Sequence, residues 1–180
     1  MNPNLLTITE KKLSKVFDRP SIRIRIPRLA INQGKFPLIR DWPNAYEKLT
    51  ISQMLAQGFN YGIRTGKQIG SCYFIVIDLD DKWAKTRMKE RRYTQTSKGI
   101  HVYCLVKKLV PYLILENSLG QRIGEVHGAN RQVVGFGSIH HTGIRYSLKG
   151  RSNAKWFLKF NTLKDLESFL AEKEIFLRKS

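Results

Sequence analysis

The chain has 180 residues, 42% of them hydrophobic, which suits one folded domain with an ordinary core. Thirty-two Lys and Arg against fourteen Asp and Glu give a formal charge of +18, which favours nucleic acid as partner over an anionic membrane or a merely solubilising or ribosomal basic surface. No run approaches the roughly 18 apolar residues of a membrane span, and no apolar signal segment begins the chain, so we expect a cytoplasmic protein that does not engage a membrane.

The first part of the chain is predicted to contain short helices and strands separated by loops. Thr7 or Thr9 is available to cap the first helix. Isoleucines alternate with Arg23 and Arg25, which predicts a half-buried strand whose arginines lie on a solvated face or touch phosphates. The expected elements are a helix over Thr9–Phe17, a strand over Ser21–Ile26, helices at about Ala45–Leu49 and Ser52–Gln57, and a strand over Asn60–Arg64.

The stretch Tyr73–Asp81, YFIVIDLDD, predicts a buried strand that ends at acidic residues. Side chains alternate along a strand, so Asp78 and Asp80 are expected on one face. Two carboxylates in one small volume repel each other, which raises a pKa or requires a cation, and oxygen ligands favour Mg²⁺ or Mn²⁺. The alternative is that Asp-x-Asp forms only a solvated turn.

Several strands are expected in the second part of the chain, together with a helix at its end. In the strand that follows Ser97-Lys98-Gly99, His101 and Tyr103 should share a face, as should Glu125 and His127 further on. Cys72 and Cys104 fall in predicted core strands without a CxxC motif or a nearby Cys/His cluster, which indicates reduced packing residues and no zinc site. The expected elements are a hairpin over Tyr93–Thr96 and Ile100–Val106, strands over Arg122–His127, Gln132–Phe136 and Ile144–Leu148, a connection over Lys107–Gly120, and a terminal helix over Asn161–Leu177.

A compact mixed sheet would bring Asp78, Asp80, His101 and Glu125 together. Two metal ions roughly 3.5–4 Å apart, held by three carboxylates, would activate an attacking hydroxyl and stabilise a leaving pyrophosphate, as in polymerases. The turn Ser97-Lys98-Gly99 offers backbone N–H groups, a hydroxyl and a cation, which suit a triphosphate.

The order of these motifs resembles the primase-polymerase (prim-pol) branch of the archaeo-eukaryotic primase superfamily, over about Lys35–Tyr146. The segments that carry the resemblance are NYGIRTG, VIDLD, SKGIH and GEVHGANRQVVGFGSIHHTGIRY. It implies an α+β fold, a mixed two-part catalytic core with an RNA-recognition-motif-like sheet flanked by helices. The whole chain, 1–180, would be one catalytic domain with an N-terminal α/β part (1–70), a catalytic sheet (71–150) and a C-terminal helix (151–180).

Carried over residue by residue, the resemblance implies that Asp78, Asp80 and Glu125 are catalytic and ligate two Mg²⁺ or Mn²⁺ ions. The residues it implies for nucleotide binding are Arg64, Thr65, Gly66, Ser97, Lys98, His101 and His140. Four of these residues have a plainer alternative: His101 as a hydrogen-bonded strand histidine, Glu125 as a structural partner of Arg122, Lys98 as a solubilising charge on an exposed turn, and His140 with Tyr146 as packing of a loop. The chain departs from the family pattern at three positions: Glu125 stands where Asp is usual, His127 where Arg is common, and Lys98 where Gly is frequent.

The implied function is that of a DNA primase/polymerase, which transfers nucleotides by a two-metal mechanism on a single-stranded DNA template, with nucleoside triphosphates as substrates. A helicase or another replication protein is a candidate partner, and the chain would be either an excised domain or a minimal stand-alone protein. A rolling-circle initiator is a weaker alternative, because it needs two histidines separated by one hydrophobic residue and His140-His141 are adjacent. A non-catalytic single-strand-binding module would use Tyr61, Tyr103 or Phe136 to stack bases, but it leaves the acidic residues unexplained.

Overall fold

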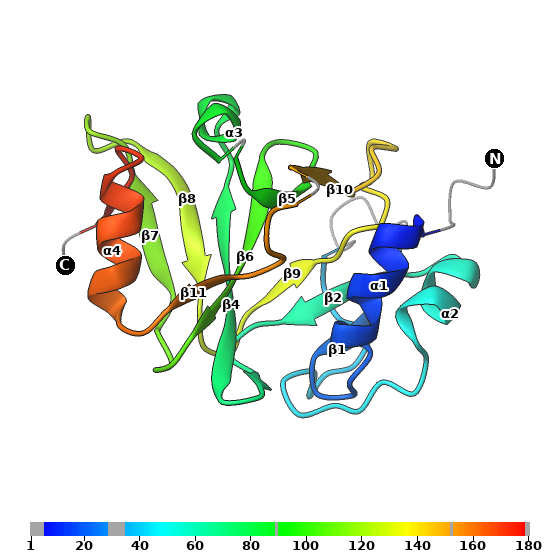
Figure 1. Ribbon diagram of the computed structural model, residues 1–180. Helices are drawn as coiled ribbons and strands as arrows, with labels where there is room; N and C mark the ends of the chain where they lie inside the picture. The colour runs from blue at the N-terminus through cyan, green and yellow to red at the C-terminus, as the bar shows by residue number, and fades with distance from the viewer. Residues whose placement is uncertain (1–5, 29–34, 89, 152, 179–180) are drawn as a thin grey trace. The chain divides into compact units, whose positions relative to one another are not determined.

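The computed structural model describes residues 6–28, 35–88, 90–151 and 153–178 (Figure 1). They form an α+β fold in which most strand pairs are antiparallel, so the α+β part of the predicted fold class is confirmed. The chain divides into two units, each built from separated segments. Unit 1 takes described residues from 1–64, 94–97 and 132–148, and unit 2 takes them from 65–93, 98–131 and 149–180. No helix within these described ranges has the length and apolar character needed to cross a membrane.

Unit 1 contains two helices and an antiparallel sheet with the strand order β1-β2-β9. Its elements are α1 (Ile8–Phe17), β1 (Arg23–Ile26), α2 (Ile51–Ala56), β2 (Asn60–Arg64) and β9 (Gln132–Val134). Each helix begins at a capping box, Thr7 with Glu10 in α1 and Thr50 with Gln53 in α2, in which side chain and backbone satisfy each other's hydrogen bonds. Of the two predicted caps for the first helix, Thr7 and Thr9, the structure uses Thr7.

Two expectations for unit 1 are wrong. Arg23 is 3% exposed instead of solvated, and its guanidinium donates to the backbone carbonyls of Glu47 and Leu49. Ala45–Leu49 is not helical. Both errors have one cause. The buried Arg23 guanidinium donates hydrogen bonds to carbonyl groups of the loop, so these carbonyls are satisfied without the backbone hydrogen bonds of a helix. Arg25, in contrast, is partly exposed and pairs with the Glu47 carboxylate at 3.6 Å.

Unit 2 is built on a sheet with the strand order β6-β4-β8-β7-β12, in which β11 also pairs in parallel with β6 and β3 pairs with β4 (Figure 1). Its strands are β3 (Gln68–Ile69), β4 (Cys72–Leu79), β6 (Ile100–Val106), β7 (Leu113–Glu116), β8 (Arg122–His127), β11 (Leu158–Phe160) and β12 (Phe176–Leu177). Its helices are α3 (Lys82–Met88) and α4 (Leu163–Ala171). Two further strands, β5 (Arg92–Gln95) and β10 (Ser147–Gly150), contain residues of both units.

The C-terminal part of unit 2 differs from the expected long helix. Helix α4 ends at Ala171, and Glu174 then adopts a positive φ of 54°, which reverses the chain. Phe176 and Leu177 pair with β7, a strand inside the predicted connection Lys107–Gly120. The expected strand Ile144–Leu148 corresponds in part to β10, which is not the last strand, because β11 and β12 follow it.

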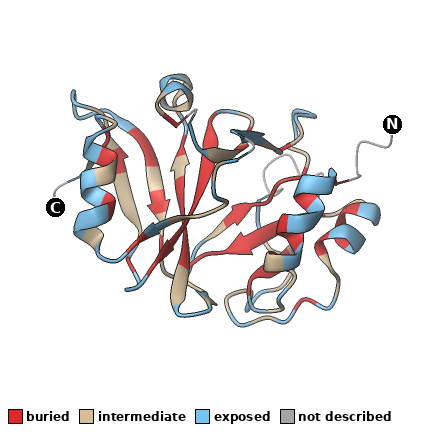
Figure 2. Cartoon of the chain, in the orientation of Figure 1, coloured by how far each residue is buried: buried red, intermediate tan, exposed pale blue. Residues whose placement is uncertain are grey.

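The core of unit 2 lies on one face of its sheet. Ile75 and Ile77 of β4 are fully buried and belong to one hydrophobic cluster with Leu166 and Leu170 of α4. Figure 2 shows buried residues concentrated in the strands, whereas much of α4 is exposed. Because side chains alternate along a strand, Asp78 points to the face opposite that of Ile75 and Ile77. The sheet thus separates the helix-covered core from the acidic face.

Candidate metal centre

Asp78 lies in the middle of the sheet and has a polar partner on each side. It pairs directly with His101 of β6 and with Glu125 of β8, both in antiparallel register. Directly opposed residues in antiparallel strands project their side chains to the same face. Strand pairing therefore brings three of the sequence-predicted site residues, Asp78, His101 and Glu125, together on the acidic face.

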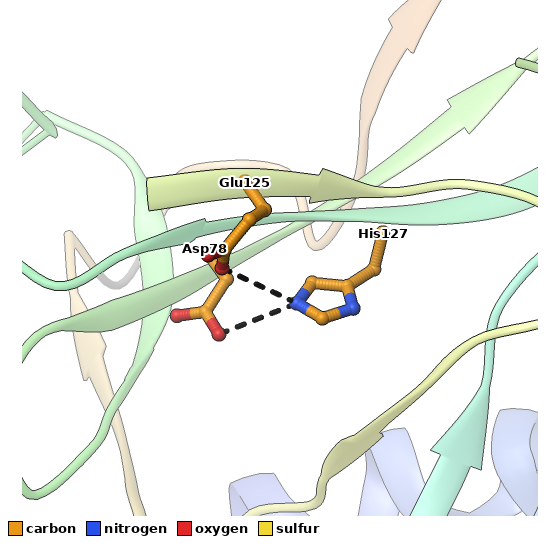
Figure 3. A group of neighbouring side chains, drawn as sticks. All are labelled: Asp78, Glu125 and His127. Carbon is orange, nitrogen blue, oxygen red and sulfur yellow. Dashed lines mark ion pairs between the residues drawn. The ribbon is translucent and has the colours of Figure 1, made fainter. Parts of the chain in front are cut away.

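Asp78, Glu125 and His127 form the metal group, in which one ligand atom from each residue lies within 4.8 Å of the others (Figure 3). The His127 Nε2 is 3.5 Å from Asp78 Oδ2 and 3.8 Å from Glu125 Oε2. His127 follows Glu125 by two residues in β8, so both side chains project to the acidic face. The sequence alternation already predicted that shared face, but His127 was not among the predicted ligands.

The metal group has the chemistry of a divalent-cation site. His127 Nδ1 is buried without a hydrogen-bond partner, and the buried Asp78 Oδ1 has only a long contact of 3.5 Å from His101 Nε2. Buried polar atoms are normally hydrogen-bonded, and coordination of a cation is one way to satisfy those that are not. Carboxylate oxygens with one imidazole nitrogen are suitable ligands for a divalent ion.

The Asp78 carboxylate is ionised even in a largely buried position. Burial acts to raise the pKa of Asp78, but the charge and hydrogen bond of His101, together with those of His127, outweigh it and hold that pKa well below its usual range. The His101 Nε2 lies 3.5 Å from Asp78 Oδ1. Histidines thus favour the anionic form that a metal ligand requires.

Glu125 has a second partner on its other oxygen. Arg122, which is 52% exposed, forms an ion pair with Glu125 Oε1, the pairing considered from the sequence as the structural alternative. The Arg122 Nη2 also donates to the hydroxyl of Tyr112 at 3.2 Å. The Tyr112 ring packs edge-on against the His127 ring, with centroids 6.0 Å apart. Arg122 and Tyr112 therefore border the metal group.

Two glycines set the spacing around the acidic end of β4. A Cβ added at Gly99, just before β6, would fall on the carbonyl oxygen of Leu79. A Cβ added at Gly124, in β8, would fall on the carbonyl oxygen of Asp78. The backbones on both sides approach β4 so closely that a side chain would displace them.

Asp80, predicted as the third carboxylate ligand, is exposed and follows the end of β4. Its backbone N–H donates to the carbonyl of Ile123 at 2.9 Å, which extends the contact between β4 and β8. The metal group contains His127 and not Asp80.

The predicted nucleotide-binding residues of unit 2 have different environments. Thr65 is buried and its hydroxyl donates to the Gly128 carbonyl at 2.6 Å, whereas Gly66 has a φ of 76°, a conformation that favours glycine. Lys98 is exposed on the turn before β6, and His101 is buried beside Asp78. Thr65 and Gly66 thus stabilise the conformation of a loop, whereas Lys98 is accessible to solvent.

The remaining predicted nucleotide-binding residues, Arg64, Ser97 and His140, belong to unit 1. Arg64 is 1% exposed, and its guanidinium donates to backbone carbonyls of the same unit, including that of Ala45 at 2.7 Å. Ser97 is half-buried. The His140 ring stacks on Tyr146 with centroids 6.2 Å apart, the packing arrangement considered from the sequence.

Comparison with known families gives one match. A family model described as "Bifunctional DNA primase/polymerase, N-terminal" matches residues 25–155, which include every member of the metal group. No curated protein and no solved structure matches the chain.

Proposed function

The chain belongs to the Prim-Pol family of bifunctional DNA primase/polymerase N-terminal domains, and from this we propose that it is a template-dependent nucleotidyl transferase of DNA replication. The observation that carries the proposal is the metal group, in which Asp78 and Glu125 are direct cross-strand partners and the His127 Nε2 approaches both of their carboxylates. Nucleotidyl transfer needs ligands that hold divalent metal ions beside the attacking and the leaving oxygen atoms.

Asp78, Glu125 and His127 would hold one divalent ion, Mg²⁺ or Mn²⁺, and the exposed Asp80 would help to hold a second. When bound, such ions activate the attacking hydroxyl and neutralise charge on the departing pyrophosphate. His101 supports this chemistry by keeping Asp78 anionic. Carboxylate-rich sites are typical for these two ions, which is why we favour them over softer metals.

The nucleoside triphosphate would lie beside the turn before β6. Lys98 is exposed there and offers an ammonium group, and Ser97 offers a hydroxyl. The buried Arg64 and Thr65 would contribute by fixing the loops that they hydrogen-bond. The formal charge of +18 supports a nucleic acid template as the second substrate.

The test is nucleotide incorporation on a single-stranded template, with and without a primer, in Mg²⁺ and in Mn²⁺. Asp78→Asn should lower incorporation by at least about 100-fold, because it removes a charged ligand. Asp81→Asn is the matched control, since the Asp81 carboxylate accepts from the Trp83 backbone N–H at 2.9 Å and belongs to no metal group within the described chain.

Products made without a primer would add priming to polymerisation. A folded, DNA-binding wild-type protein that incorporates nothing under any of these conditions would overturn the proposal. Equal activity of Asp78→Asn and wild type would overturn the assignment of the site.

A further inference from the structure

A basic pocket of about 430 Å³ lies in unit 2, away from the metal group. Four cationic residues line it, and together they define what we call the basic pocket: Arg87, Arg91, Arg151 and Lys173. Arg87 is at the end of α3, Arg151 follows β10, and Lys173 follows α4, so three segments distant in sequence supply the charges.

Three of the four cations of the basic pocket lie against aromatic rings. The Arg91 guanidinium lies 5.7 Å from the centroid of Phe169, and the Lys173 ammonium lies 6.0 Å from the same ring. The Arg87 guanidinium lies 3.0 Å above the Trp83 ring and also donates to the Lys173 carbonyl. Because these contacts restrict long side chains beforehand, less conformational entropy is lost when an anion binds.

Two carboxylates lie beside the four cations, and both are exposed. Glu90 pairs with Arg151 at 3.2 Å, and Glu174 pairs with Arg87. Exposed ion pairs contribute little to stability, so a phosphate can replace these carboxylates at low cost. The basic pocket therefore keeps a positive excess.

The basic pocket and the metal group belong to opposite sides of the sheet of unit 2. Met88 of α3 and Leu170 of α4 share the hydrophobic cluster with Ile77, and the basic pocket is built at the ends of these same helices. Asp78 projects from the other face of β4. A ligand of the basic pocket is therefore separate from the reacting groups.

We propose that the basic pocket binds the phosphate backbone of single-stranded nucleic acid outside the reaction site. Guanidinium groups match phosphate oxygens in bidentate geometry, and three of the four cations are arginines. Trp83 is 40% exposed next to Arg87 and offers a ring surface for an unpaired base. The inference goes beyond nucleotidyl transfer, because it concerns binding of the strand and not its extension.

The test is fluorescence anisotropy with a labelled oligothymidylate, in EDTA and without nucleotides, so that the result does not depend on catalysis. The variant Arg91→Gln/Arg151→Gln removes two charges from exposed side chains. Its affinity should fall by about tenfold at about 0.1 M salt, and the slope of log K against log salt by about 1.4, since each phosphate contact on a single strand contributes about 0.7. The control Lys11→Gln/Lys12→Gln removes the same charge from exposed positions of α1 and should lose less than about twofold.

Equal losses in the variant and the control would overturn the proposal, because net charge alone would then explain binding. Selective loss of binding to phosphatidylserine vesicles, with oligonucleotide binding intact, would overturn it as well. If the Gln variant does not fold, Arg91→Lys/Arg151→Lys keeps the charge and removes the forked donors. That variant should bind less tightly than wild type, and unchanged affinity would contradict an arginine site.

Discussion

Asp78 and Glu125 are direct partners across the antiparallel pair β4 and β8, which places two carboxylates on one face of the sheet. Each offers a carboxylate oxygen to the metal group and is a proposed ligand, so neutralising either one should weaken metal binding. Loss of a group in the outer shell of a metal site typically lowers metal affinity by about 10- to 100-fold. Glu125→Gln removes a proposed direct ligand, so it should lower Mn²⁺ affinity by about 100-fold or more. Titration followed by electron paramagnetic resonance measures this directly, and Glu116→Gln in β7 is the control. Unchanged Mn²⁺ affinity in Glu125→Gln would remove Glu125 from the site.

Arg122 competes with a metal ion for Glu125, because its guanidinium pairs with that carboxylate. Arg122→Gln should therefore bind Mn²⁺ about two- to fivefold more tightly, the range expected for loss of one ion pair made by a largely exposed arginine. Arg178→Gln removes a comparable arginine, which pairs with Glu116, and should leave Mn²⁺ affinity unchanged. Weaker metal binding in Arg122→Gln would show instead that Arg122 positions Glu125 for the ion.

Glu10 should make the stability of the protein depend on pH. Burial acts to raise the pKa of Glu10, but hydrogen bonds from Arg145 and from the Thr7 backbone N–H outweigh it and lower the pKa. Because the folded-state pKa is lowered, this stabilisation is fully present above the unfolded value of about 4.3 and is lost as pH falls through the folded value.

Glu10→Gln tests this dependence, since it removes the charge from a side chain that is 1% exposed. The variant should lose about 2 kcal/mol of unfolding free energy at about pH 7. The free energy of unfolding, measured with urea, should also fall less steeply with decreasing pH in this variant than in wild type below about pH 4.3. The exposed Glu167→Gln is the control, and a parallel decline in Glu10→Gln and wild type would contradict the assignment.

The two cysteines should differ in reactivity. Cys104 is fully buried in β6, and burial raises the pKa of its thiol, whereas Cys72 is partly exposed at the start of β4. The thiolate is the reactive form, so a thiol reagent should modify only Cys72 in the native protein and both residues in denaturant. A Cys72→Ser variant should show almost no native reactivity. Rapid modification of that variant would mean that β6 opens readily.

Local patterns predicted much of the fold. The apolar run before Asp78 and the alternation around His101 and Glu125 placed these residues on the correct strands and faces. Strand order is not local, and nothing in the sequence alone placed β4 between β6 and β8. The RNA-recognition-motif-like character of the sheet stays a prediction.

The missed features depend on tertiary contacts. The two-residue strand β12 forms because Phe176 and Leu177 meet β7, and a segment so short carries no period of its own. Arg64 could be predicted as a phosphate ligand but not as a residue whose guanidinium binds backbone carbonyls, because those carbonyls come from distant loops. His127 was readable as a neighbour of Glu125 on one face, but its approach to Asp78 required the pairing of β4 with β8.

Gly99 and Gly124 have a consequence for mutational scanning of this domain. Neither residue carries a functional group, yet a substitution at either would push a neighbouring strand away from the backbone that supports Asp78. A library selected for activity would therefore be depleted at both positions as severely as at the metal ligands. A parallel selection for abundance would tell the two classes apart, because replacing a proposed ligand should leave a folded, inactive protein, whereas replacing either glycine should also lower the amount of folded protein.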